Sequence, residues 1–192
     1  MKKTGLLFGS FNPIHIGHLI IAGYMYEFSD LEELWFVVSP YNPLKEKQSL
    51  LPDHHRLEMV NLAIDDDPRF RSCNIEFKMP QPSYTIHTLT WLQEKYPNRE
   101  FVIISGTDIF PTFYKWKNWE KLLELYKFYV YPRPGSKDHE LTRHPSVKLF
   151  EAPMMEISAS FIREAIRSGK NMSYYLPEKT YRYIQEMHFY EK

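Results

Sequence analysis

Continuous apolar runs alternate with helically periodic segments along this chain, and each run has the length of a strand. Strands are predicted at residues 4–8, 33–39, 100–105, 128–131 and 147–150, with a weaker candidate at 70–77. The run at 33–39 lacks polar alternation, which is typical of a strand buried on both faces of a parallel sheet.

Between these runs the apolar positions recur with helical spacing. Helices are predicted at residues 19–28, 53–66, 85–96, after 118, from about 157 to Gly169, and from Pro177 onwards. Asn12, Ser83 and Asn118 are the expected N-caps, with Pro13 at a first helical position. Alternating strands and helices predict an α/β, Rossmann-like fold with a mostly parallel sheet and helices on both faces. Ligands of such sheets bind at the carboxyl ends of strands, where the strand order reverses.

Composition narrows the class of protein. The 192 residues suit one domain, 1–192, with a C-terminal helical portion from about 157 to 192 packed on it. A net charge of zero gives no sign of a large nucleic-acid surface, and no segment approaches the ~20 apolar residues that span a bilayer. The single cysteine, Cys73, fits a reducing compartment. We expect a cytoplasmic protein without nucleic-acid or membrane partners; the oligomeric state stays open, a homo-oligomer included.

The first strand runs into the segment Gly-Ser-Phe-Asn-Pro-Ile-His-Ile-Gly-His, residues 9–18. A strand-to-helix turn presents backbone N–H groups to anions, phosphate above all. His15 and His18 are three apart and share one face of the first helical turn. Gly17 between them costs a helix roughly 1 kcal/mol against alanine, which the close approach of a ligand would explain. A plainer interpretation is two solvated histidines on a turn; a lone pair would favour it, but here a strand and the residues Gly-Ser-Phe-Asn-Pro precede the histidines.

Four further residues carry candidate chemistry. Ser160 and Arg163 lie three apart at the start of a helix, so they form a second candidate anion site, although an isolated pair would be an ordinary cap and a surface arginine. Lys45 follows the second strand and can meet a phosphate or remain a solvated lysine. Asp108 follows the strand at 100–105 and can accept hydrogen bonds from ribose hydroxyls or cap the next helix. His54 and His55 are expected at the surface, and no protein metal site is predicted.

Taken in order, these motifs resemble those of bacterial nicotinate-nucleotide adenylyltransferases, members of the HxGH nucleotidyltransferase superfamily. The resemblance covers nearly the whole chain and rests on residues 9–18, 83–85 (Ser-Tyr-Thr), 106–108 (Gly-Thr-Asp), Trp116, 133–135 (Arg-Pro-Gly) and 157–163 (Ile-Ser-Ala-Ser-Phe-Ile-Arg). It implies adenylyl transfer from ATP to nicotinate mononucleotide, which yields nicotinate adenine dinucleotide and pyrophosphate. The mononucleotide phosphate attacks the α-phosphorus of ATP in line, without a protein nucleophile.

The resemblance also implies roles for individual residues. The catalytic group is His15, His18, Ser160 and Arg163. The ATP-binding group adds Gly9, Ser10, Phe11, Gly106, Asp108 and Ser158. The nicotinate-nucleotide group is Lys45, Ser83, Tyr84, Thr85, Trp116 and Arg133. Mg²⁺ is expected as an ion carried by the ATP phosphates. The chain departs from the family pattern at His87, Ile109 and Tyr114, where an acid, an asparagine and a histidine are expected; these departures bear on the nicotinate pocket.

Other readings of the same motifs remain. His15-Ile16-Gly17-His18 also spells the HIGH motif of class I aminoacyl-tRNA synthetases, but the Lys-Met-Ser-Lys-Ser loop is missing and the chain is too short for a tRNA-binding domain. A related transferase acting on nicotinamide mononucleotide or phosphopantetheine is a nearer alternative. A nucleotide-binding sensor without turnover is a third, although both predicted phosphate-binding motifs are intact.

Overall fold

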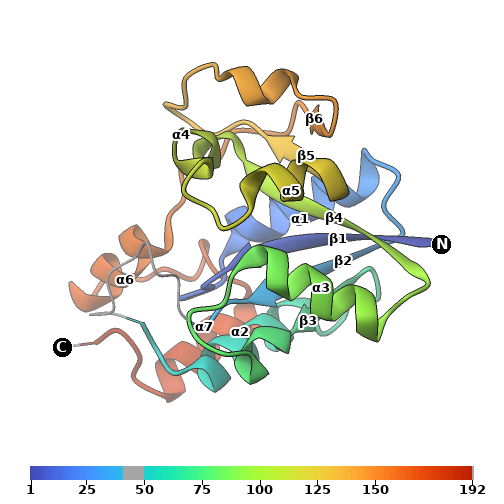
Figure 1. Ribbon diagram of the computed structural model, residues 1–192. Coiled ribbons are helices and arrows are strands. Elements are labelled where there is room, and N and C mark those ends of the chain that lie inside the picture. Colours follow the sequence, from blue (N-terminus) through green and yellow to red (C-terminus); the bar gives the residue numbers. More distant parts are fainter. Residues whose placement is uncertain (41–49, 192) are drawn as a thin grey trace.

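The computed structural model describes residues 1–40 and 50–191, and its described strands form one parallel six-stranded sheet in the order β3-β2-β1-β4-β5-β6 (Figure 1). The strands are β1 Lys2–Gly9, β2 Glu33–Val38, β3 Phe70–Cys73, β4 Arg99–Gly106, β5 Lys127–Tyr131 and β6 Val147–Leu149. The helices are α1 Ile16–Glu27, α2 Asp53–Ile64, α3 Thr85–Lys95, α4 Phe110–Phe113, α5 Trp119–Leu125, α6 Ala159–Arg167 and α7 Glu178–Glu186. Short 3₁₀ turns are η1 Ile75–Lys78, η2 Thr107–Ile109 and η3 Glu140–Arg143. The predicted parallel α/β fold is confirmed.

The strand order reverses between β1 and β4. The chain builds outward from β1 to β2 and β3, then crosses back and places β4 on the other side of β1. The loops that leave β1 and β4 therefore diverge to opposite faces and open a crevice at the carboxyl ends of these strands. Residues 9–18 and 106–108 leave the sheet at this point.

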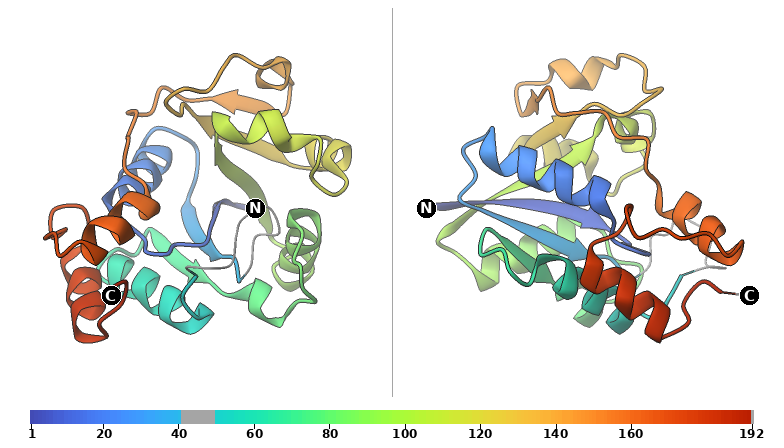
Figure 2. Two further views of the ribbon diagram at one scale, coloured as in Figure 1. Left: turned by 90° about the vertical axis from the view of Figure 1, so that its left-hand side faces the viewer. Right: turned by 180° about the vertical axis from the view of Figure 1, so that it is seen from behind.

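Helices cover both faces of the sheet (Figure 2), and an apolar core lies on each face. Leu7 points into the core beneath α1, α2, α6 and α7, whereas its neighbour Leu6 points into the core beneath α3, α4 and α5. Both leucines are almost fully buried, and each such burial stabilises the fold by about 1.5–3 kcal/mol. Strands covered on both faces explain why the sequence shows continuous apolar runs.

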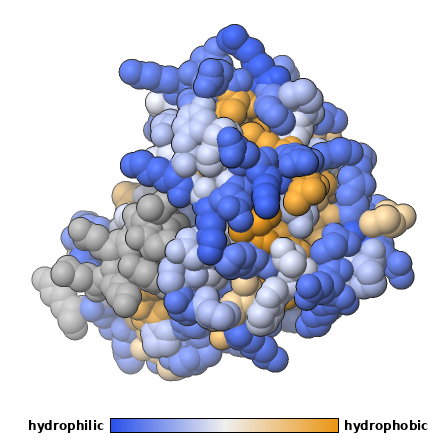
Figure 3. Space-filling view, viewed as in Figure 1, coloured by the Kyte–Doolittle hydropathy of each residue, from blue (hydrophilic) through white to orange (hydrophobic). Residues whose placement is uncertain are grey.

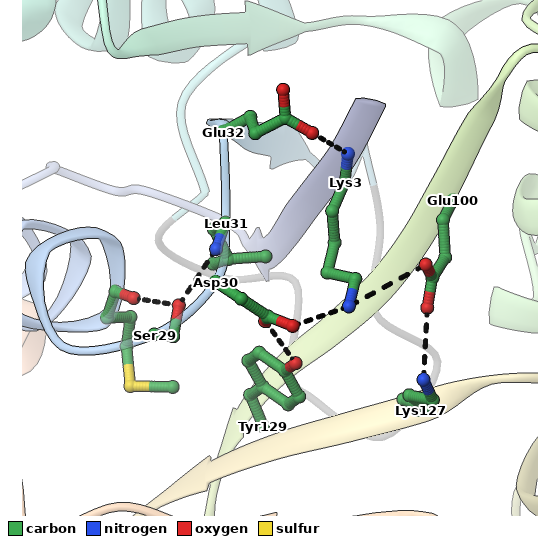
Figure 4. A network of polar contacts seen from close by, with 9 residues as sticks. Lys3, Ser29, Asp30, Leu31, Glu32, Glu100, Lys127 and Tyr129 are labelled. Atoms are coloured by element: carbon green, nitrogen blue, oxygen red, sulfur yellow. Dashed lines mark hydrogen bonds and ion pairs between the residues drawn. The ribbon is translucent and has the colours of Figure 1, made fainter. Parts of the chain in front are cut away.

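A polar network joins the beginnings of the central strands (Figure 4). Lys3 Nζ lies 2.6 Å from Asp30 Oδ2 and 3.7 Å from Glu100 Oε2, and Lys127 Nζ lies 3.3 Å from Glu100 Oε1. The Tyr129 hydroxyl donates a hydrogen bond to Asp30. Because these acids are solvent-accessible, each ion pair contributes little to stability. The network lies at the amino ends of the strands, away from the crevice.

Two predicted helix caps are wrong. Helix α1 begins at Ile16 with His15 as its N-cap. Asn12, predicted as that cap, is buried, and its Oδ1 accepts hydrogen bonds from the Tyr190 hydroxyl at 2.8 Å and the Leu51 N–H at 3.3 Å. The peptide bond from Asn12 to Pro13 is cis, and Pro13 lies in the turn before the helix.

The second wrong cap is Ser83, because Tyr84 precedes α3 and the Ser83 hydroxyl donates to Glu76 Oε2 at 3.0 Å. Asn118 does stand at the N-cap of α5, with a φ of 55° and no side-chain capping bond. The weak strand at 70–77 ends at Cys73, and η1 takes up its second half.

The face shown in Figure 3 is mainly hydrophilic, with apolar residues reaching the surface between α3 and α5. Among the described residues, no helix has the length and apolar character required to cross a membrane.

Candidate functional site

The turn after β1 has a strained and tightly packed backbone. Phe11 has a φ of 44°, a left-handed conformation that costs a non-glycine residue roughly 1–2 kcal/mol. Its ring packs against Phe36 at 5.6 Å and His18 at 5.1 Å between ring centroids. A Cβ atom at Gly9 would stand 2.8 Å from the Phe11 ring. Gly9 is therefore needed for the ring to fold back over the end of the strand.

His15 and His18 form a stacked pair at the end of this turn. Their ring centroids are 3.8 Å apart with an interplanar angle of 27°. The His15 backbone N–H donates to His18 Nδ1 at 3.2 Å, which places the proton of a neutral His18 on Nε2. A Cβ atom at Gly17 would stand 3.1 Å from the His15 ring and 3.5 Å from Ile157 Cβ. The His15 ring therefore gives a packing reason for Gly17, and the close approach of a ligand there stays a prediction.

Burial fixes the charge of His15. Its side chain is almost inaccessible, and this burial lowers the pKa of His15 to about 4, with a further contribution from the positive charge of Arg133. His15 is thus neutral near pH 7 rather than a cation.

The start of α6 lies beside this turn. Arg163 Nη1 donates to the Asn12 carbonyl at 2.8 Å, and its Nη2 donates to Ser160 Oγ at 3.4 Å. Partial burial lowers the pKa of the Arg163 guanidinium, which stays charged. Ser158 caps α6, and its hydroxyl accepts from the Phe161 N–H at 3.2 Å. Two predicted anion sites that are far apart in the sequence are therefore in direct contact.

Residues following β4 and β5 form the adjoining wall. A Cβ atom at Gly106 would stand 2.4 Å from Asp108 Oδ1 and 2.5 Å from Arg133 Cγ, so only glycine lets both side chains lie over the strand end. Asp108 Oδ2 and Arg133 Nε are 3.8 Å apart. A hollow of about 250 Å³ is lined by Asp108, Arg133, Ile157 and Ser158 among others. It joins the Gly106–Asp108 loop to the segment that leads into α6.

The residues assigned to the nicotinate nucleotide divide into two places. Lys117 Nζ lies 4.7 Å from the centre of the Tyr84 ring, which connects the 83–85 loop with the segment that carries Trp116. The Trp116 ring packs 5.2 Å from Phe113, and Thr85 opens α3. Arg133, in contrast, lies beside Asp108 and His15, two residues assigned to ATP.

The remaining predicted positions are Lys45 and the three departures from the family pattern. Lys45 lies outside the described residues. The exposed His87 ring is 5.7 Å from Tyr84. The Tyr114 hydroxyl donates to Glu140 at 2.7 Å, and Ile109 ends η2.

The surface prediction for the histidines of α2 holds for His54, which is exposed. His55 is only partly exposed, and its Nδ1 lies 2.8 Å from the Tyr183 hydroxyl. Across residues 1–40 and 50–191, no group of three or more His, Cys, Asp or Glu residues is arranged to hold a metal ion.

Sequence reasoning missed the residues that hold these loops from beneath. Arg56 is fully buried on α2 and donates to loop carbonyls. The helical spacing of Arg56 could have predicted its burial, because it shares a helix face with the buried Val60 and Ile64. Glu76 and Tyr190 act through tertiary hydrogen bonds, and no local pattern marks either residue.

Comparisons with known proteins identify the family of the chain. The family model described as cytidylyltransferase-like matches residues 6–165. A protein of Flavobacterium johnsoniae described as a probable nicotinate-nucleotide adenylyltransferase is 51% identical, covering 99% of this chain and 100% of its own. A Bacteroides fragilis protein with the same description is 48% identical, over 95% of this chain and 90% of its own.

Solved structures share the fold. Nicotinic acid mononucleotide adenylyltransferase of Plasmodium falciparum, complexed with NaAD, has a TM-score of 0.82 at 23% identity, covering 99% of this chain and 98% of its own. At that identity the likeness bears on the fold alone, whereas the full-length bacterial relatives bear on the family. The chain therefore belongs to the cytidylyltransferase-like family and, within it, to the nicotinate-nucleotide adenylyltransferases.

Proposed function

We propose that this enzyme transfers the adenylyl group of ATP to nicotinate mononucleotide, forming nicotinate adenine dinucleotide and pyrophosphate. The observation that carries the proposal is the 2.8 Å hydrogen bond from Arg163 to the Asn12 carbonyl, which places the α6 turn against the His15–His18 turn. Two helix starts that converge in this way offer N–H groups and side-chain donors to one polyphosphate. The membership of the chain in a family of adenylyltransferases supports the same reaction.

In this proposal catalysis consists of positioning and charge stabilisation. His15 and His18 bind the phosphates around the reacting α-phosphorus, with the Gly9–Phe11 backbone alongside. His18 donates from Nε2, because its Nδ1 is occupied by the His15 N–H. Ser160 and Arg163 hold the β- and γ-phosphates, and the guanidinium stabilises the negative charge that grows on the departing pyrophosphate. The attacking oxygen belongs to the mononucleotide phosphate, so no protein nucleophile takes part.

The two nucleosides use the remaining residues. Asp108 and Gly106 meet the adenosine half, and Ser158 lies at the wall between them and α6. Ser83, Tyr84 and Thr85 bind the nicotinate nucleotide, and Trp116 stacks on its pyridine ring. Lys45 and Arg133 supply positive charge to the nicotinate nucleotide. The location of Arg133 beside Asp108 lets it reach both nucleotides.

Mg²⁺ enters this reaction with the substrate, on the ATP phosphates, where it needs few protein ligands. Bound there, it neutralises phosphate charge during transfer. The partners are ATP and nicotinate mononucleotide, and the free, buried thiol of Cys73 suits an enzyme of the reducing cytoplasm.

Pyrophosphate release tests the proposal directly. The wild-type enzyme is supplied with ATP, Mg²⁺ and one of nicotinate mononucleotide, nicotinamide mononucleotide or phosphopantetheine. We expect the highest kcat/KM with nicotinate mononucleotide. His18→Ala lowers that value at least about 100-fold, as expected when a transition-state donor is removed, while the exposed His54→Ala retains it. A preference for either of the other acceptors would overturn the assigned substrate, and no release with any acceptor would indicate a nucleotide-binding sensor.

A further inference from the structure

Arg56 on α2 has a fully buried side chain that ends among backbone carbonyls beneath the candidate site. Its guanidinium donates to Ser10 O at 2.6 Å, Ser39 O at 2.7 Å, Leu51 O at 2.8 Å, Pro40 O at 3.1 Å and Asp53 Oδ1 at 3.2 Å. These acceptors come from the turn after β1, the end of β2 and the start of α2. One side chain thus joins three segments at the carboxyl edge of the sheet.

Burying a guanidinium is unfavourable, and burial lowers the pKa of Arg56. Its acidic neighbour Asp53 is half-exposed and offsets part of that desolvation. An apolar side chain on this helix face would avoid the penalty, as Val60 and Ile64 do. It would also leave the carbonyls of Ser10 and Ser39 without this donor. The arrangement is therefore suited to holding loop backbone in place rather than to filling the core.

The Ser10 carbonyl is significant because of its neighbour. The next residue, Phe11, has a positive φ that strains the turn after β1. Arg56 holds the carbonyl before Phe11, and Arg163 holds the carbonyl after it, at Asn12. A strained backbone persists only where its surroundings fix it from several sides. The two guanidiniums provide this fixation on both sides of the strained residue.

We infer that Arg56 is a positioning residue for adenylyl transfer, a role that rests on the proposed function. By holding Ser10 it keeps the strained turn in the shape that aligns His15 and His18 with the phosphates. Being fully buried, Arg56 touches no substrate itself. Arg163 differs in this respect, since its half-buried guanidinium is assigned to the pyrophosphate.

Steady-state kinetics and thermal unfolding of Arg56→Lys test this inference, with Val60→Ala as the matched control. Lysine keeps the charge, but its single nitrogen cannot reach five acceptors in a fork. Val60 is equally buried on the same helix and is not among the partners of Ser10. We expect Arg56→Lys to lower kcat about 10- to 100-fold, as for reacting groups displaced by about 1 Å. Val60→Ala lowers the Tm comparably and keeps the wild-type kcat.

A second readout follows the turn itself. The imidazole NMR signals of His15 and His18 shift in Arg56→Lys and not in Val60→Ala. In Arg56→Ala, millimolar guanidinium restores part of the lost kcat, whereas methylammonium does not. If Arg56→Lys does not fold, the neutral Arg56→Gln replaces it in the kinetic, unfolding and NMR measurements.

Wild-type kcat in a folded Arg56 variant would overturn the inference. So would an equal loss of kcat in Val60→Ala, because stability alone would then account for the effect. A wild-type enzyme that binds an ATP analogue but releases no pyrophosphate from ATP and nicotinate mononucleotide would instead refute the proposed function. The NMR comparison and the affinity for that analogue would still decide the role of Arg56.

Discussion

Burial, rather than a neighbouring acid, sets the protonation of the first histidine in the site. The His15 ring stacks on His18 and is shielded from water, so the charged form is disfavoured. A neutral imidazole at this point donates or accepts one hydrogen bond without changing the net charge of the pocket. In the proposed function, the positive charge for the phosphates comes from arginine, which does not titrate near pH 7.

The stability of the fold should depend on pH through the buried His15. The pKa of His15 is about 4 in the fold and about 6.5 in the unfolded chain. Between these values the unfolded chain binds a proton that the folded protein does not, so the free energy of unfolding falls as the pH falls from 6.5 to 4. The loss is about 3 kcal/mol. Urea unfolding from pH 4 to 6.5 should show that the difference in unfolding free energy between wild type and His15→Asn changes by this amount. A difference that stays constant over this pH range would contradict the lowered pKa of His15.

At Gly106 the absence of a side chain makes room for two others. In Gly106→Ala the new Cβ meets Asp108 Oδ1 and Arg133 Cγ, so both side chains must move. We expect a stability loss below about 1 kcal/mol and a KM for ATP about tenfold higher, equivalent to one lost charge-assisted hydrogen bond. Gly23→Ala is the control, because its Cβ meets nothing within 4 Å in α1. It should raise stability by about 1 kcal/mol and leave KM unchanged.

At the scale of elements, η1 and α3 are joined through one buried acid. Glu76 accepts hydrogen bonds from Thr88 Oγ1 at 2.7 Å and Ser83 Oγ at 3.0 Å. Burial raises the pKa of Glu76, and these hydroxyls only partly oppose that rise. The acid thereby fixes the start of α3 and the 83–85 loop.

Because the pKa of Glu76 is raised in the fold, ionisation weakens the folded protein. Its stabilising contribution is present below pH 4.5 and is lost as the pH rises through the folded pKa. Glu76→Gln stays neutral and keeps an acceptor for Thr88. Its stability relative to wild type should therefore increase with pH above about 4.5. Denaturant unfolding from pH 4 to 8 measures this, with the exposed Glu94→Gln as control; a difference without pH dependence would refute the role.

The sequence predicted the strands that are buried on both faces. It did not predict helix caps whose side chains bind distant partners instead of the helix backbone. The strands were identifiable because residues such as Leu6 and Leu7 face separate cores. Asn12 and Ser83 have the right chemistry for caps, but Tyr190 and Glu76 bind them instead. Those partners are distant in the sequence or lack any local pattern, so capping rules do not anticipate them. Arg56 was also missed, although its helical spacing from Val60 and Ile64 places it on the buried face of α2.

At the scale of the whole molecule, the C-terminal end closes on the first motif. The Tyr190 hydroxyl reaches Asn12, and the buried Thr180 hydroxyl on α7 donates to the Met59 carbonyl of α2 at 3.1 Å. The Arg163 and Tyr190 contacts connect the C-terminal part of the chain to the turn at Asn12, and the Thr180 contact docks α7 on α2. The stability of the turn therefore depends on how the C-terminal segment docks.

Tyr190→Phe tests this dependence, since it removes one hydroxyl from a buried contact. We expect a loss of about 1 kcal/mol in the free energy of unfolding and a raised KM for ATP. Tyr174→Phe on a fully exposed ring should change neither quantity. An unchanged KM and unchanged stability in Tyr190→Phe would show that the turn does not depend on the C-terminal end.

The central claim is that one triphosphate lies between the two helix starts. A crystal structure of the enzyme with a non-hydrolysable ATP analogue tests it most directly. The account predicts phosphate oxygens within hydrogen-bonding distance of both the His15–His18 pair and the Ser160–Arg163 pair. Phosphates bound to one pair, with the other pair left in solvent, would contradict it.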